Sequence, residues 1–69
     1  MTNSDETPLE MGERHVAEGG VRIARQNEIV DEMDRDDHPA AAARGRRVLA
    51  TMERTLRVLR QHLKILRGG

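Results

Sequence analysis

A seven-residue repeat of aliphatic and small side chains runs through each half of this chain. In the first half it consists of two interleaved sets, Leu9, Val16, Ile23 and Val30, and then Gly12, Gly19, Gln26 and Met33. In the second half the corresponding sets are Ala42, Leu49, Leu56 and Leu63, and then Gly45, Met52, Leu59 and Leu66. Spacings that alternate between three and four residues are typical of α-helices packed along a coiled-coil seam. The repeat therefore predicts two long helices and an all-α fold.

Capping residues and prolines indicate where these helices begin and end. Thr7 and Glu10 have the spacing of a capping box, with Pro8 at the first helical position. Before Pro39 the helical conformation is disfavoured, and an Asp or His there can cap the second helix. We predict a disordered tail over 1–6 and a hairpin over 7–67, with helices over about 8–35 and about 39–67. The loop covers about 36–38, and Gly68-Gly69 form a C-terminal tail.

A loop this short makes the two helices antiparallel neighbours. The two seam sets then face each other in pairs whose residue numbers add to 75. Each seam glycine faces a larger aliphatic side chain, in the pairs Gly12–Leu63, Gly19–Leu56 and Gly45–Val30. Glycine within a helix costs about 1 kcal/mol relative to alanine, and room for the opposing side chain is a physical reason to keep it. The alternative is that Gly19-Gly20 is a kink. We predict an antiparallel two-helix coiled-coil hairpin.

Charge is distributed unevenly along a chain whose net charge is zero. Residues 1–37 carry eleven acidic and four basic side chains, and residues 38–69 carry eight basic and one acidic. In the hairpin, the acids at the open end, among them Glu13, lie beside Arg60, Lys64 and Arg67. Those at the loop end, among them Asp34, lie beside Arg44, Arg46 and Arg47. Exposed pairs contribute only about 0–1 kcal/mol each, so we expect the charges mainly to specify which helices pair and in which direction.

Apolar side chains outside the seam indicate a further packing partner. They widen the apolar stripe of both helices, as expected for helices with more than one neighbour. A chain of 69 residues without cysteine also has few other means of stabilisation. We therefore expect a homodimer that forms a four-helix bundle. Its expected interface comprises Ile29, Val48, Val58, Ile65, Leu49, Leu56 and Leu63. A different protein partner for this face stays open, and so does ordinary solvent exposure.

Two histidines and a carboxylate are the candidate metal ligands. His15 and His62 lie on one flank of the predicted hairpin, and Glu18 is one turn beyond His15. Such side chains bind zinc or another divalent ion when they converge. No recognisable ligand motif accompanies them, so we favour two partly solvated polar residues and keep a metal-binding bundle as an alternative.

The second helix carries an arginine-rich surface that could contact a polyanion. The candidate residues are Arg44, Arg46, Arg47, Arg54, Arg57 and Arg60. The first helix carries an opposite charge, the pI is about 6.8 rather than above about 9, and there is no aromatic residue to stack on a base. We therefore favour solvated and paired arginines, with a small nucleic-acid-associated regulator as the alternative function.

Other features indicate neither catalysis nor a membrane. There is no cysteine nucleophile, no Ser or Thr with a convergent His and carboxylate, and no glycine-rich phosphate loop. We expect no enzymatic activity and no cofactor. No apolar run approaches the ~20 residues that span a bilayer, and residues 1–8 do not have the order of a signal peptide. We therefore expect a cytoplasmic protein without membrane contact.

Two stretches, ERHVAEGGVRIARQ (13–26) and LATMERTLRVLRQHL (49–63), resemble a group of short helical proteins found chiefly in alphaproteobacteria. The resemblance covers about residues 13–66. It implies a first helix containing histidine and glycine, an acidic loop and a second helix, and it implies no activity or catalytic residue. The chain departs from the group at Asp37 and Pro39, where a Gly-His-Asp-like turn is more usual. Together these features predict a non-enzymatic helical interaction or oligomerisation module.

Overall fold

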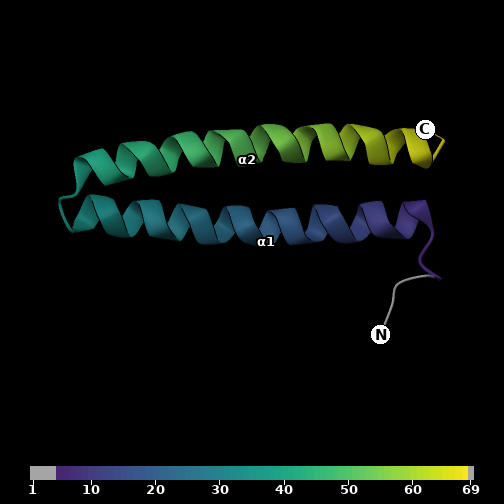
Figure 1. The fold of residues 1–69 in the computed structure, drawn as a ribbon, viewed down its shortest axis with the longest axis horizontal. Helices are drawn as coiled ribbons and strands as arrows, with labels where there is room; N and C mark the ends of the chain where they lie inside the picture. The colour runs from purple at the N-terminus through teal and green to yellow at the C-terminus, as the bar shows by residue number, and fades with distance from the viewer. Residues whose placement is uncertain (1–4, 69) are drawn as a thin grey trace.

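The computed structural model describes residues 5–68 as two antiparallel α-helices lying side by side (Figure 1). Helix α1 covers Pro8–Arg35 and α2 covers Pro39–Leu66. No strand occurs within residues 5–68. The all-α two-helix hairpin is therefore confirmed. The expected tail over 1–6 lies outside the described residues for 1–4, and so does Gly69.

Local capping features mark the start of α1 and the end of α2. The Glu10 amide donates to Thr7 Oγ1 at 3.1 Å, and the Thr7 amide donates to Glu10 Oε1 at 2.9 Å, which confirms the capping box. Helix α2 ends at Leu66, one residue earlier than expected, with Arg67 as its C-cap. Gly68 follows with a φ of +79°, a conformation in which glycine has no Cβ penalty.

The loop between the helices is closed by a Schellman-type turn. The His38 amide donates to the Met33 carbonyl at 2.8 Å, and the Asp37 amide donates to the Asp34 carbonyl at 3.2 Å. Asp37 occupies the left-handed position of this turn with a φ of 59°. His38 is the N-cap of α2 by position, but its side chain makes no capping hydrogen bond, so capping by a histidine side chain is not realised.

Replacing Asp37 with glycine is expected to stabilise the hairpin by about 1 kcal/mol, because a left-handed φ costs other residues roughly that amount. Asp37→Asn and Asp37→Ala remove the negative charge beside Asp34 and Asp36, as Asp37→Gly does. The three variants therefore differ in the cost of the left-handed backbone, which is greatest for alanine. Thermal unfolding should rank the variants Gly above Asn above Ala; equal stability of all three would contradict a backbone origin.

The seam between the helices has the expected register. A Cβ added at Gly12 would lie 3.1 Å from Leu63 Cδ1, and one at Gly19 would lie 3.1 Å from Leu56 Cδ1. A Cβ at Gly45 would lie only 2.8 Å from Val30 Cγ2. These contacts confirm the three glycine pairs and show that each glycine admits a side chain of the other helix.

The interior of the hairpin is small. Among the described residues the buried apolar side chains are Val30, Ala42, Leu56 and Leu63, and Gly45 is buried with them. The remaining seam residues are half-buried, except Leu66, which is exposed. Helix α1 continues without a break through Gly19-Gly20, so a helix-ending kink there is not observed. A two-helix seam cannot enclose its own side chains completely, because each helix has a neighbour on one side only.

Candidate functional site

The hairpin has two broad faces, one on either side of the seam. Residues seven apart lie on one face of a helix, since seven residues make nearly two turns. We call the first the histidine face; its central rows are His15, Arg22 and Ile29 of α1, and Val48, Thr55 and His62 of α2. We call the other the ion-pair face; its rows are Glu13, Gly20 and Asp34 of α1, and Arg46, Glu53 and Arg67 of α2.

Ion pairs between the helices lie on the ion-pair face. Arg46 Nη2 contacts the Asp34 carboxylate at the loop end. Arg67 Nη2 donates to Glu13 Oε2 at 3.0 Å at the open end. Acids of α1 thus pair with arginines of α2 at both ends, as the charge pattern predicted. An open groove of about 500 Å³ between these pairs is lined by Gly20, Ile23, Glu53, Leu56, Arg57 and Arg60.

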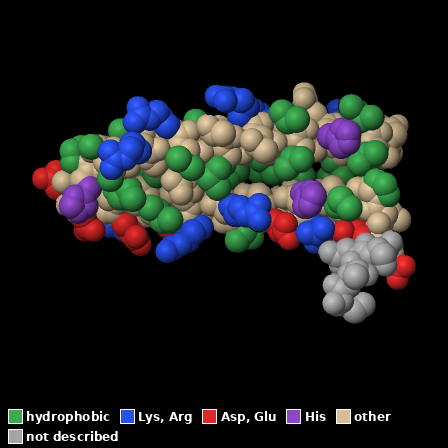
Figure 2. Space-filling view, in the orientation of Figure 1, with side chains coloured by type: hydrophobic (Ala, Val, Ile, Leu, Met, Phe, Trp, Pro, Cys, Tyr) green, Lys and Arg blue, Asp and Glu red, His purple; other side chains and the backbone are tan. Residues whose placement is uncertain are grey.

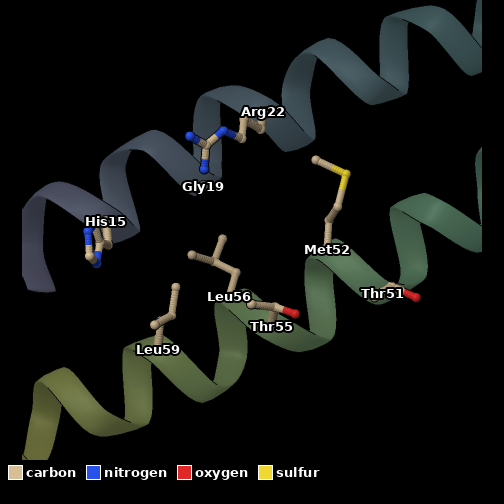
Figure 3. A pocket seen from close by; sticks show the side chains of 8 residues that line it. All are labelled: His15, Gly19, Arg22, Thr51, Met52, Thr55, Leu56 and Leu59. Atoms are coloured by element: carbon tan, nitrogen blue, oxygen red, sulfur yellow. The ribbon is translucent and has the colours of Figure 1, made fainter.

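The histidine face has a different, mainly apolar groove. It is open, has a volume of about 380 Å³, and lies where Gly19 leaves space opposite Leu56. Figure 3 shows His15 and Arg22 on the α1 side and Thr51 and Thr55 on the α2 side. Its remaining lining residues are Met52, Leu56 and Leu59. A groove with apolar walls and no ion pair across it is suited to receive apolar side chains.

Exposed aliphatic side chains continue this face beyond its central rows. Val48 is 51% exposed, Val58 is 59% exposed and Ile65 is 73% exposed. Ile29 of α1 is half-buried on the same face, and Met11 is exposed one row outside it. Of the seven residues expected to form an interface, Leu49, Leu56 and Leu63 are also seam residues, and Leu56 and Leu63 are buried in the seam. The accessible part of that set therefore consists of the four β-branched residues.

The six candidate arginines do not form one surface. All six are exposed, but Arg46 is paired with Asp34, and Arg57 and Arg60 line the groove on the ion-pair face. Arg47 and Arg54 are seven residues apart on the outer side of α2, and Arg44 borders the histidine face. Figure 2 shows basic side chains along the outer edge of α2, and both acidic and basic side chains along α1. Spread around a helix in this way, the arginines offer no single stripe to a polyanion.

The candidate metal ligands are not assembled. Histidine side chains of both helices are visible on the face turned to the viewer in Figure 2, but no group of three or more His, Asp or Glu side chains placed to hold a metal ion occurs within residues 5–68. Glu18 Oε2 instead accepts a hydrogen bond from Arg14 Nη1 at 3.2 Å. With two imidazoles and no third protein ligand, these residues fall short of a structural zinc site.

A contact that the sequence did not reveal holds the segment before α1. Arg14 Nε and Nη2 donate to the two carboxylate oxygens of Glu6, both at 3.0 Å. The Glu6 side chain is only 16% exposed, whereas residues 1–6 were expected to form a disordered tail. Hydrogen bonding from Arg14 lowers the pKa of Glu6, and Glu6 and Glu18 together raise the pKa of Arg14. A bidentate arginine of this kind is among the stronger pairings of side chains.

Acidification should release Glu6 from Arg14 before it unfolds the hairpin. Because the folded-state pKa of Glu6 is lowered, its contribution is complete above the ordinary glutamate pKa and is lost as the pH falls through the lowered value. Carbon-detected NMR titration of the Glu6 carboxyl should give a midpoint below that of an unstructured glutamate. Arg14→Gln should restore the ordinary midpoint, while Arg25→Gln, at a site paired only with Glu28, should not. An unchanged midpoint in Arg14→Gln would contradict the assignment.

No family model, curated protein or solved structure matches this chain. The resemblance to short alphaproteobacterial proteins therefore stays a prediction, and any function has to be argued from the faces of the hairpin.

Neither helix within residues 5–68 has an apolar stretch long enough to cross a bilayer. The two grooves of the hairpin lie on its two broad faces. The ion-pair face is occupied in part by contacts between the helices, and the histidine face carries the unpartnered aliphatic side chains.

Proposed function

We propose that this chain is a non-enzymatic assembly module, a helical hairpin that pairs with a second copy of itself through the histidine face to form a four-helix bundle. The observation that carries this proposal is the amount of surface the chain leaves exposed. A compact monomer of this mass exposes about 4,400 Å² by the general relation between mass and area. The hairpin of 7.8 kDa exposes 5364 Å². The excess of about 1,000 Å² reflects the elongated shape of a lone hairpin, 46 × 30 × 12 Å. A partner that covers the ~800 Å² of a standard interface would remove most of it.

The composition of the histidine face supports its role as the interface. Val58 and Ile65 of α2 lie seven residues apart in the row next to that of Val48, and all three have large exposed fractions. The groove at Gly19 provides a recess on the same face. Burying such side chains contributes roughly 25 cal/mol per Å² of apolar surface. Val21 is also exposed, at 71%, but it lies on the outer side of α1, where an isolated aliphatic residue is ordinary.

Sedimentation equilibrium across micromolar concentrations tests this function. The expected mass of the wild-type chain is twice 7.8 kDa. Val48→Asp and Ile65→Asp should each raise the dissociation constant at least tenfold, because an unpaired charge would be buried in the interface. Val21→Asp is the matched control, since it places the same charge on the outer side of α1.

Circular dichroism of each variant establishes that the helices are intact before the masses are compared. A wild-type mass of 7.8 kDa at all concentrations would overturn self-association. Equal weakening of the dimer by Val21→Asp and Val48→Asp would show that the histidine face is not the contact surface.

A further inference from the structure

We propose that the two copies are related by a twofold axis parallel to the helices, so that α1 of each copy lies over α2 of the other. This arrangement rests on the proposed self-association and specifies its geometry. Two hairpins stacked face to face can be related by a twofold axis that runs either along the helices or across them. An axis along the helices keeps every residue at the same height and places α1 over α2. An axis across them reverses the height and places α1 over α1 and α2 over α2.

The charge distribution distinguishes these two arrangements. The acidic half of the chain forms α1 and the basic half forms α2. With the axis along the helices, each acidic helix therefore has basic neighbours both within its own copy and across the interface. With the axis across the helices, like-charged helices face each other. Juxtaposed like charges are a common means by which an interface excludes the wrong geometry.

The aliphatic side chains of the histidine face match one another in the first arrangement, and Arg22 of its central row comes near Thr55 of the second copy. Residues of α1 and α2 at the same height have numbers that add to about 75, as the glycine contacts show. An axis along the helices preserves height, so a residue of α1 meets the residue of the second copy's α2 with that same sum. Met11 then lies near Ile65 of the second copy, and Ile29 lies near Val48. Each contact joins apolar side chains that the lone hairpin leaves exposed or half-buried.

The charged residues bordering this face also match. Glu32 comes near Arg44 of the second copy in the same register, and both side chains are exposed. Within residues 5–68, neither of them forms an ion pair in the hairpin itself. The symmetry of the dimer would form this pair twice, once at each edge of the interface.

The second arrangement brings unlike side chains together. If α1 is centred on α1 so that Met11 meets Ile29 of the second copy, His15 comes near Arg25 of that copy. In the same register on α2, the exposed Ile65 comes near Arg44 of the second copy. A guanidinium would then lie against an aliphatic side chain, and its charge would lose hydration without a partner.

Cysteine cross-linking between differently labelled copies tests the arrangement, because the natural chain has no cysteine. Ile29→Cys and Val48→Cys are placed on separate chains, mixed, and oxidised in a glutathione buffer at a concentration where sedimentation shows a dimer. The expected result is a mixed disulfide that forms at least tenfold faster than the homodimeric disulfide of either variant alone. A mixture of Met11→Cys and Ile29→Cys chains probes the other arrangement and should react slowly.

The two levels of the proposal fail in different ways. A monomeric wild-type chain would overturn the proposed function itself. A dimeric chain in which the Met11→Cys and Ile29→Cys mixture reacts faster would overturn only the axis along the helices and assign the axis across them. A dimeric chain in which neither mixture reacts faster than the single variants would overturn this use of the histidine face.

Discussion

Replacing Leu56 with alanine is expected to lower the free energy of unfolding by about 3 kcal/mol, the middle of the range for large-to-small substitutions in cores. Leu56 is 5% exposed, and its Cδ1 lies 3.1 Å from the point where a Cβ of Gly19 would be. Because the opposing residue is glycine, no side chain from α1 can move into the space that the leucine leaves. Urea unfolding followed by circular dichroism, at one fixed protein concentration, measures the effect.

Two further variants show whether this loss comes from the seam. Val21→Ala removes a similar amount of aliphatic side chain from an exposed position, and its effect should stay within about 0.5 kcal/mol. Adding Gly19→Ala to Leu56→Ala should recover part of the loss, since the new methyl group points into the vacated space and alanine also favours the helix. If Leu56→Ala and Val21→Ala were equally mild, the seam would not be the source of stability.

Gly45→Ala is expected to destabilise the hairpin, whereas alanine normally stabilises a helix relative to glycine. A Cβ at this position would lie 2.8 Å from Val30 Cγ2 and 3.4 Å from Gln26 Nε2. Overpacking of this kind costs about 1–3 kcal/mol and outweighs the ~1 kcal/mol gain in helix propensity. The Gly45 carbonyl also accepts a hydrogen bond from Gln26 Nε2 at 3.0 Å. Separating the helices at this position would therefore break a second contact.

Gly20→Ala is the matched control for Gly45→Ala. No atom outside the helix backbone lies within 4 Å of a Cβ built at Gly20, so this substitution should add stability of about 1 kcal/mol from helix propensity alone. Thermal or urea unfolding should therefore move in opposite directions for the two glycines. A stabilising Gly45→Ala would show that the helices can separate at Val30 without cost.

Composition and spacing identified the histidine and arginine candidates, but they did not determine which side chains surround them. His15 and His62 were expected to lie on one flank of the hairpin, and the register of the seam places both of them on the histidine face. Whether a third ligand converges on them depends on side-chain conformations, and Glu18 is drawn instead toward Arg14. The arginines were identified individually, but their distribution around α2 became apparent once the seam was located.

Sequence alone determined the features that depend on short-range geometry and periodicity. The seven-residue repeat predicted the two helices, Thr7 and Glu10 predicted the capping box, and the glycine positions predicted the register of the seam. These could be read directly because helix spacing is regular and because a glycine facing a leucine at one height also sets the heights of its neighbours.

Tertiary structure decided which of several similar side-chain pairings forms and which backbone conformation the loop adopts. Arg14 of α1 binds Glu6, which precedes the helix, and nothing in the spacing selects that carboxylate over its neighbours. Asp37 adopts a left-handed conformation because the short loop closes on Met33, although residue type alone would favour glycine there. The pairing of Arg14 with Glu6 and the left-handed turn residue Asp37 are set by tertiary contacts, whereas the helices and their register are set by the repeating pattern of the chain.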